Sequence, residues 1–255
     1  MARNIKLTLA YDGTHFNGWQ VQPERATIQG ALGEAIERIT GEKVLPQGSG
    51  RTDAGVHALA QVATFSTTSS IPSGNLLKAL NSMLPETIRV LVAEEVEDGF
   101  HARYSAMAKT YEYRIYRGEI CPPFVVNQVY HHPYPLLEEA MKEAATLVTG
   151  EHDFTSFAAV DPEKNAPEGN GEKLASNVRK ISMSRWERRG EELIYRVRGN
   201  GFLHHMVRNL VGTFLMVGKG TIEPSDISSI ITARQRSAAG PTAPASGLYL
   251  VSVEY

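Results

Sequence analysis

Apolar and polar side chains alternate along residues 5–11, which is the pattern of a half-buried β-strand that ends at a turn. Further on, Thr27 can cap a helix whose apolar residues recur on one face. The remaining elements predicted in this half are a short strand at 43–46, a strand at 59–67, a short helix opened by Ser73, and a strand at 88–97. The first half of the chain therefore has the predicted order β-α-β-β-α-β.

The same kinds of pattern return in the second half of the chain. The predicted elements are a strand at 107–117, a helix at 136–148, a hairpin of strands at 178–188 and 192–200, helices at 202–217 and 225–234, and a closing strand at 248–255. Two such units predict an α+β protein of two ferredoxin-like (split βαβ) halves, residues 1–105 and 106–255, with antiparallel sheets joined around a central cleft. The polar stretch at 160–176, which contains Pro and Gly, is predicted to be a mobile insertion.

The composition supports a folded chain and excludes several classes of protein. Of the 255 residues, 42% are hydrophobic and 21% are charged, which is enough apolar surface for a real core. Cys121 is the only cysteine, so an intrachain disulfide and a cysteine-rich zinc site are both excluded. No stretch approaches the roughly 20 apolar residues that span a bilayer, and residues 1–16 lack the apolar core of a secretion signal. We therefore expect a cytoplasmic protein without a membrane partner.

The distribution of charge along the chain is more informative than the net charge. A formal charge of −2 argues against a strongly electropositive nucleic-acid binder. Residues 173–208, however, contain nine Lys or Arg and three Glu, and most of these lie on the predicted hairpin. One face of that hairpin could therefore be basic, although many charge runs are only solvated surface. Arg179 and Lys180 in this segment are candidates for contacts with an RNA backbone.

A glycine-rich loop at 48–58 surrounds Arg51 and Asp53. Glycine lets the backbone turn sharply and lets a ligand approach it closely. On an extended loop both side chains could point the same way, and the guanidinium would keep the carboxylate ionised, as a nucleophile or a base requires. The equally favoured alternative is a β-turn in which Asp53 bonds its own backbone. The loop lacks the pattern of a phosphate-binding P-loop.

Basic and aromatic residues are combined in the stretch at 100–114. A tyrosine beside a groove can stack on a base, while Arg103 and Lys109 can hold phosphate. The alternative is that Tyr111 and Tyr113 are core aromatics of a strand, and we expect this for one of the two.

The predicted helix at 202–217 carries a charged residue among apolar ones. His204 and Arg208 are four residues apart and would share a helix face. The adjacent His204 and His205 match no common zinc spacing, and no third ligand is evident, so a metal site is not predicted. A buried arginine needs a carboxylate or a phosphate as its partner. Asp53 is one candidate partner of Arg208, and a structural pair with another acid is the alternative.

Six segments together resemble the TruA family of tRNA pseudouridine synthases, along nearly the whole chain. They are AYDGTHFNGWQ, GSGRTDAGVHA, FHARYSAMAKTYEYRIY, GEHDFTSF, GFLHHMVRNLVG and ASGLYLVSVEY. Among them GRTDAGVHA is highly specific, and the segments follow one another in the family's order. The stretch at 160–176 departs from the family, because it is longer and more acidic than the family pattern.

The resemblance implies roles for five residues. Asp53 has the position of the family's catalytic aspartate, and Tyr111 has that of the tyrosine that stacks on the target uracil. Arg208 resembles the arginine that pairs with the catalytic carboxylate, and Arg51 resembles the arginine beside the flipped nucleotide. Leu248 lies in the segment that lines the same pocket. These five residues form the predicted substrate site.

The resemblance also implies a substrate, an assembly and a fold. The family isomerises uridine to pseudouridine in the tRNA anticodon stem-loop, at positions 38, 39 and 40, without a metal or an organic cofactor. It has the two-half α+β fold and acts as a homodimer that grips one tRNA across both subunits. We therefore expect an RNA-modifying isomerase of tRNA processing.

The chemistry of this reaction requires an ionised carboxylate but leaves its route open. The N1–C1′ bond breaks, the base turns, and C5 bonds to C1′, so neither an energy source nor a redox partner is needed. Asp53 could attack C1′, add to C6 of the uracil, or act as a base on the sugar. Tyr111 could accept the final C5 proton, although its reference pKa of about 10 makes this demanding.

Two other functions are consistent with parts of the sequence. A non-catalytic RNA-binding module would keep the groove and form no product. A metal-dependent hydrolase would use His204, His205 and His101, and it would be sensitive to chelators.

Overall fold

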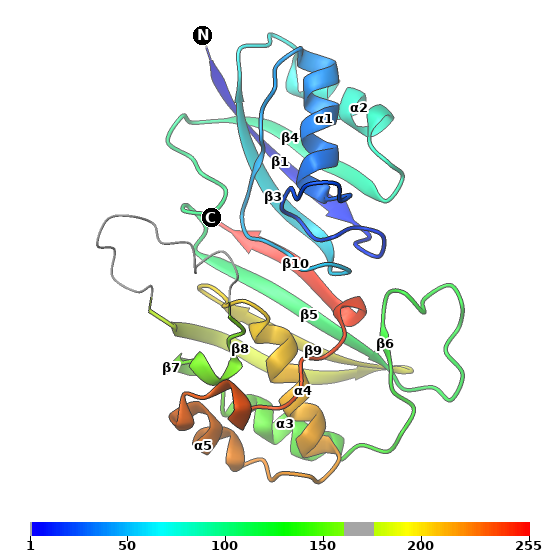
Figure 1. Ribbon diagram of the computed structural model, residues 1–255, viewed down its shortest axis with the longest axis vertical. Coiled ribbons are helices and arrows are strands. Elements are labelled where there is room, and N and C mark those ends of the chain that lie inside the picture. Colours follow the sequence, from blue (N-terminus) through cyan, green and yellow to red (C-terminus); the bar gives the residue numbers. More distant parts are fainter. Residues whose placement is uncertain (1, 161–175) are drawn as a thin grey trace. The chain divides into compact units, whose positions relative to one another are not determined.

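The chain folds into two units, each with its own strands and helices (Figure 1). The computed structural model describes residues 2–160 and 176–255, so most of the predicted insertion at 160–176 lies outside the described residues. The first unit contains Met1–Thr110, Phe124–Val129 and Ala245–Tyr255, and the second contains Tyr111–Pro123 and Tyr130–Pro244. Helices and mainly antiparallel strands occur together, so the predicted α+β class is confirmed.

The first unit follows the predicted order of elements. They are β1 (Arg3–Tyr11), α1 (Ile28–Thr40), β2 (Gln47–Gly48), β3 (His57–Thr67), α2 (Ser73–Met83), β4 (Ile88–Val96) and, from the end of the chain, β10 (Leu248–Glu254). The strand order is β4-β1-β3-β10, and β2 pairs with β3. Because β1 pairs antiparallel with both β3 and β4, the predicted antiparallel arrangement is confirmed here. The short strand lies at 47–48 and not at 43–46.

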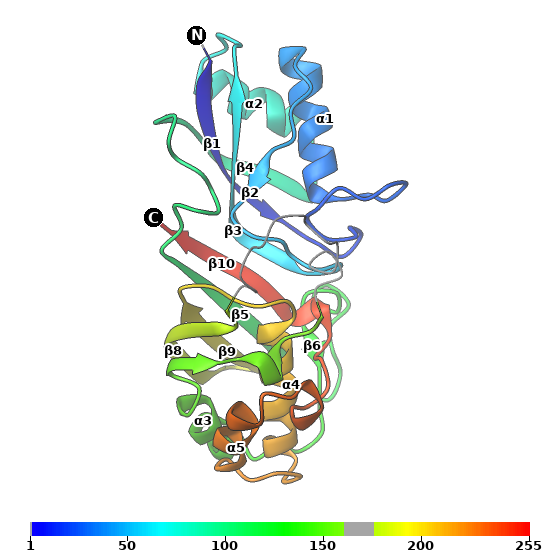
Figure 2. The same cartoon turned by 60° about the vertical axis from the view of Figure 1, so that its left-hand side comes forward.

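Helix α1 begins and ends at residues whose chemistry suits those positions. The Thr27 side chain accepts a hydrogen bond from the Gly30 N–H, and Gly41 ends the helix in the left-handed conformation at φ 75°. Leu32 and Ile36 lie on its buried face. Both α1 and α2 lie on the same side of the strands, which Figures 1 and 2 show from two directions. The helices therefore cover one face of the sheet in the first unit.

The second unit is built around a hairpin. Its elements are β5 (Ala108–Tyr116, of which residues 108–110 belong to the first unit), β6 (Tyr130–His131), α3 (Glu138–Thr146), β7 (Gly150–Asp153), β8 (Val178–Arg189), β9 (Glu192–Gly199), α4 (Met206–Gly218) and α5 (Asp226–Ala233). The strand order is β5-β9-β8-β7, and β6 pairs with β5. The predicted hairpin is confirmed, because β8 and β9 pair antiparallel and Gly190 turns between them at φ 56°. The sequence does not predict β6 and β7, which are too short to show a period.

The closing strand β10 belongs to the first unit, whereas the sequence places it in the half 106–255. Tyr249 and Leu250 of β10 pair in parallel with His57 and Ala58 of β3. Alternation along residues 248–255 predicts a strand, but the alternation does not specify which strand is its partner. Since the chain enters the first unit three times, a single boundary after residue 105 does not describe its division.

Helix α4 begins four residues later than predicted. His205 has a positive φ of 58°, a conformation that does not continue a right-handed helix, so α4 begins at Met206. His204 therefore lies outside the helix, and the predicted shared helix face of His204 and Arg208 is wrong.

Helix α4 is buried on nearly every side within the second unit. Its Phe214 ring contacts the rings of Trp186 and Tyr195 from the hairpin. A Cβ at Gly212 would lie 1.6 Å from the carbonyl oxygen of Pro241, so only glycine lets residues 241–244 pass this close to the helix. Neither α4 nor any other described helix is long and apolar enough to cross a membrane.

Candidate active site

The loop between β2 and β3 carries Asp53. The Val56 N–H donates to the Asp53 carbonyl oxygen (3.1 Å) and Gly55 has a φ of 76°, so the chain turns sharply just after the aspartate. Thr52 is buried, whereas Arg51 is exposed and Asp53 is partly exposed. The loop therefore directs both predicted side chains away from the core.

A buried polar network holds this loop from beneath. Gln61 of β3 is fully buried; its side-chain nitrogen donates to the Gly50 carbonyl (2.9 Å), and its Oε1 accepts from the Ser49 hydroxyl (2.7 Å). The Tyr11 hydroxyl lies 2.9 Å from Thr52 Oγ1 and 3.4 Å from the Gln61 nitrogen. Burial raises the pKa of Tyr11 to about 12, so this hydroxyl keeps its proton. The network satisfies buried polar groups of three residues just before the aspartate, which fixes the loop.

Two glycines let the segment AYDGTHFNGWQ approach the same loop. A Cβ at Gly18 would lie 2.5 Å from the Thr52 carbonyl oxygen, and one at Gly13 would lie 2.0 Å from that of Val56. The Trp19 N–H donates to the Thr52 carbonyl (3.0 Å). The main chain of this segment therefore supports the loop directly.

His57 joins three separate stretches of the first unit below the loop. Its Nδ1 accepts from the Gly13 N–H (3.1 Å), and its Nε2 lies 3.1 Å from the Asn127 carbonyl oxygen and 3.2 Å from that of Ser246. Because both carbonyls need a donor, we assign the ring proton to Nε2. The ring also stacks on Tyr249 at 4.7 Å between centroids. His57 thus fixes the two segments that return to the first unit.

The His57 ring is neutral in this arrangement. Burial lowers the pKa of His57, and this effect opposes the nearby Asp12 carboxylate, whose Oδ1 lies 3.1 Å from Nδ1. The neutral ring uses Nδ1 as the acceptor that the Gly13 N–H needs. Leu248 directly precedes Tyr249 in the chain, so His57 links the Leu248 segment with the Asp53 loop.

The Lys109 ammonium points at the loop. It donates to the Ser49 carbonyl, and it lies 2.8 Å from the place that a Cβ on Gly50 would take. Burial, together with the nearby charge of Arg103, lowers the pKa of Lys109 to about 8. The sequence predicts that Lys109 contacts an RNA backbone, and this stays a prediction. What the structure shows is that Lys109 binds the loop at Ser49.

Tyr111 and Tyr113 lie two residues apart on β5, in the second unit. The Tyr111 ring contacts Phe202 edge-on, at 5.0 Å between centroids and an angle of 76°. The Tyr113 hydroxyl donates to the Pro244 carbonyl (2.8 Å), and burial raises the pKa of Tyr113. Both rings are buried, Tyr113 fully and Tyr111 with 8% of its surface exposed, so Tyr113 is the clearer core aromatic of the pair.

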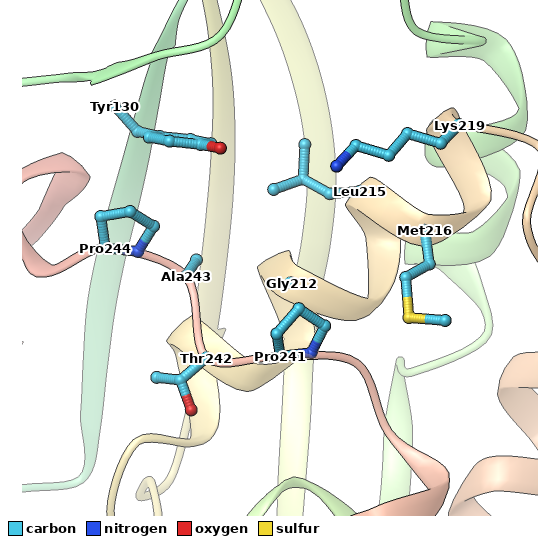
Figure 3. A pocket seen from close by; sticks show the side chains of 9 residues that line it. All are labelled: Tyr130, Gly212, Leu215, Met216, Lys219, Pro241, Thr242, Ala243 and Pro244. Atoms are coloured by element: carbon cyan, nitrogen blue, oxygen red, sulfur yellow. The ribbon is translucent and has the colours of Figure 1, made fainter.

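The main chain of Ala243 orients the Arg208 side chain. The Nε of Arg208 donates to the Ala243 carbonyl (2.8 Å), and the Ala243 N–H donates to the Arg208 carbonyl (3.1 Å). Figure 3 shows residues 241–244 running beside α4 next to Gly212. The close approach at Gly212 therefore determines where the arginine is held.

A pocket of about 140 Å³ lies in the second unit, beside residues 241–244 and the later turns of α4 (Figure 3). Tyr130, Met216 and Lys219 contribute to its lining. None of the predicted site residues lines this pocket, so it is not the predicted substrate site.

The predicted residues are divided between the two units. Those of the first unit are Arg51, Asp53, Arg103, Lys109 and Leu248, and those of the second are Tyr111, Arg179, Lys180 and Arg208. Within the first unit the structure brings the Asp53 loop, Lys109 and the Leu248 segment together. Near the start of β8, Arg179 donates to the Ser176 and Val178 carbonyls and Lys180 is exposed.

Sequence patterns miss the residues that support the site. Gln61, Tyr11 and His57 are all buried, yet they occur in alternating or polar segments that show no sign of a shared network. The one available signal is the polar Gln61 inside an otherwise apolar strand segment, since a buried amide requires partners.

Comparison with known proteins identifies relatives along almost the whole chain. A family model described as tRNA pseudouridine synthase matches residues 8–105 and 144–255. The tRNA pseudouridine synthase A of Solibacter usitatus is 53% identical over 99% of this chain and 100% of that protein. The proteins of the same name from Caldicellulosiruptor saccharolyticus and Bacillus pumilus are each 45% identical, over 99% and 98% of this chain and 100% and 98% of their own lengths.

A solved structure, that of a Cbf5-Nop10-Gar1 complex, has 14% sequence identity and a TM-score of 0.28, over 82% of this chain and 54% of that chain. A likeness of this size is too weak to define a shared fold. The sequence relatives are decisive: the chain belongs to the tRNA pseudouridine synthase family. This membership confirms the predicted enzyme class, an isomerase that converts uridine to pseudouridine in tRNA.

The lowered pKa of Lys109 predicts a distinctive dependence of stability on pH. The folded chain releases this proton near pH 8, whereas the unfolded chain holds it up to about pH 10.5. The unfolded state therefore binds more protons between these values, so the free energy of unfolding rises with pH from about 8. We expect Lys109→Met to remove this rise in urea titrations between pH 7.5 and 9, where the tyrosines of the unfolded chain are still mostly protonated.

Lys78→Met, at an exposed lysine of α2, is the matched control and should keep the slope of the original chain. An unchanged slope in Lys109→Met would show that this ammonium is not buried against the loop.

Proposed function

We propose that this enzyme forms pseudouridine in the tRNA anticodon stem-loop, at positions 38, 39 and 40, with Asp53 as its catalytic nucleophile. The observation that carries the proposal is the loop itself. Its backbone is held by buried polar groups, while the carboxylate that follows them stays partly exposed. A fixed carboxylate that a substrate can reach is what nucleophilic attack needs.

The reaction is an isomerisation, so its atoms balance without a co-reactant. The N1–C1′ bond breaks, a C5–C1′ bond forms, and the proton on C5 is replaced by one on N1. Asp53 attacks C1′, adds to C6, or acts as a base on the sugar, and the loop geometry is compatible with each of these routes. The target uridine must leave its base stack, which costs roughly a few kcal/mol. Contacts between the enzyme and the RNA backbone offset this cost.

The other predicted residues have roles at the target nucleotide and along the RNA. We propose that Tyr111 stacks on the uracil, that Arg208 interacts with the catalytic carboxylate, and that Arg51 lies beside the flipped nucleotide. Leu248 lines the same pocket. Contacts to the RNA backbone are assigned to Arg103, Lys109, Arg179 and Lys180.

The enzyme is further proposed to act in the cytoplasm as a homodimer that holds one tRNA across both subunits. The family resemblance supports this assembly. Light scattering should then give twice the 28.0 kDa of one chain. A single-chain mass at micromolar concentration would contradict it.

The proposal is tested by tritium release from tRNA that carries 5-tritiated uridine. Formation of pseudouridine releases the label, because C5 loses its hydrogen. We expect Asp53→Asn to reduce this release by about three orders of magnitude or more, since the amide is neither a nucleophile nor a base. Mapping of the modified positions in the same samples tests the assignment to 38, 39 and 40.

Asp98→Asn is the matched control, because Asp98 is an exposed acid of the same unit, and it should release tritium at the original rate. A folded Asp53→Asn chain that retains full activity would exclude Asp53 as the nucleophile. Binding of tRNA with no product from the original chain would instead support a non-catalytic RNA-binding module. Loss of activity with EDTA would support a metal-dependent enzyme.

A further inference from the structure

A tight turn between β4 and β5 presents an aromatic ring to solvent. Tyr104 is 78% exposed, although it lies in a turn with several internal hydrogen bonds. A large exposed aromatic side chain on an ordered backbone is a common feature of binding surfaces.

The turn is rigid because His101 and Ser105 close it. The Nδ1 of His101 accepts from the N–H groups of Arg103 (3.0 Å) and Tyr104 (3.3 Å). The His101 N–H donates to the Ser105 hydroxyl (3.0 Å), and the Ser105 N–H donates back to the His101 carbonyl (3.0 Å). The main chain that carries Tyr104 is therefore fixed before any ligand arrives.

The base of the turn is anchored in the core of the first unit. Ala102 is fully buried; its N–H donates to Thr64 Oγ1 of β3 (3.3 Å), and its carbonyl accepts from the Tyr255 hydroxyl (2.8 Å). Ala102 thus points inward while Tyr104 points outward, and the turn is attached to β3 through Thr64 and to Tyr255, the residue after β10.

The Tyr104 ring is also held by its neighbours. The His101 ring lies 4.4 Å away between centroids, and the Arg103 guanidinium carbon lies 5.8 Å from the Tyr104 centroid. These contacts already restrict the rotation of the ring, so the ring loses less conformational entropy when a ligand binds. The ring is preorganised, and a positive charge stands beside it.

The turn is close to the loop that carries Asp53. Thr64 of β3, which accepts from the Ala102 N–H at the base of the turn, pairs with Gln47 of β2, and the Asp53 loop begins directly after β2. The Arg103 charge is also near enough to Lys109 to lower the pKa of that lysine. Lys109 in turn donates to the Ser49 carbonyl in the loop. The turn with the exposed ring and the proposed catalytic loop are therefore both attached to the paired strands β2 and β3 of one unit.

We propose that Tyr104, supported by His101 and Arg103, is a stacking platform for an unpaired base of the tRNA near the target uridine. The proposal deepens the proposed function and rests on it for the position of the target. Every base has a π-face, so a tyrosine ring accepts different bases at this place. Arg103 is placed to attract the phosphate of the same nucleotide. Such a platform fits an enzyme that modifies several adjacent positions, because it holds the strand without selecting a sequence.

The test is the binding of an unmodified tRNA transcript to the full chain, measured by filter binding at fixed salt. We expect Tyr104→Ala to raise Kd by about 5- to 150-fold, as loss of one stacked base does. Tyr104→Phe keeps the π-face and should restore the original Kd, whereas Tyr104→Leu keeps apolar bulk without it and should not. The single-turnover rate at saturating tRNA should stay within about twofold in all three variants, because the platform binds but does not react.

Tyr134→Ala is the matched control. Tyr134 is 68% exposed and its ring also contacts a histidine, His132, so this substitution removes an equivalent surface ring and should leave Kd unchanged. An unchanged Kd in Tyr104→Ala would overturn the proposal. A Kd for Tyr104→Phe as high as that of Tyr104→Ala would also overturn it, since the tyrosine hydroxyl and not the ring would then bind the tRNA. A change in chain mass by light scattering with unaltered Kd would show a contact between copies of the chain instead.

The outcomes separate this inference from the proposed function. Asp53→Asn should bind tRNA like the original chain, so its Kd reports on the platform even without catalysis. If Asp53→Asn is inactive and Tyr104→Ala binds tRNA with the original Kd, the stacking platform is excluded and the proposed function is retained. If Asp53→Asn keeps its activity, Asp53 is excluded as the nucleophile, and the proposal for Tyr104 is unaffected.

Discussion

The hydrogen bonds of one buried amide, that of Gln61, determine where the Asp53 loop lies. Three glycines near Arg51 and Asp53 make this loop costly to order, because glycine loses the most backbone freedom on folding. Gln61 offsets that cost by accepting from the buried Ser49 hydroxyl and donating to the partly buried Gly50 carbonyl. Each of these groups would cost about 1–3 kcal/mol if left buried without a partner, so other positions of the loop are disfavoured.

The rest of the first unit extends the same principle. Strand β3 carries both Gln61 and His57, so one rigid element supports the loop and also fixes the two returning segments of the chain. Tyr11 contributes from β1, and Lys109 contributes from the start of β5. Few of these groups are exposed. If Asp53 is the nucleophile that we propose, they position its carboxylate in advance, which lowers the entropy that the reaction must lose.

Periodicity predicted most elements correctly, because most helices and strands of this chain have one buried face; α4, which is buried on nearly every side, is the exception. It failed where a single backbone conformation or a distant partner decides the outcome. His205 adopts a positive φ and delays α4, and alternation in β10 could not reveal its parallel pairing with β3. The candidate chemical residues were found by their motifs. Their supports were not, because a polar Gln61 within an apolar stretch signals a buried amide but does not reveal its partners, and only the neighbours in space show them.

The central claim is that the Gln61 amide positions Asp53, and the most direct measurement is the single-turnover rate of Gln61→Glu on tRNA. Glutamate has the same size, but in its ionised form it cannot donate to the Gly50 carbonyl. In its protonated form it has one O–H donor where the amide has two N–H donors, so it cannot serve both Gly50 and Tyr11. The account predicts a rate at least about tenfold lower at saturating tRNA with an unchanged Kd, in a chain that circular dichroism shows to be folded. The exposed Gln22→Glu substitution, which introduces the same charge away from the network, should leave the rate unchanged. A folded Gln61→Glu chain that reacts at the original rate would contradict the account.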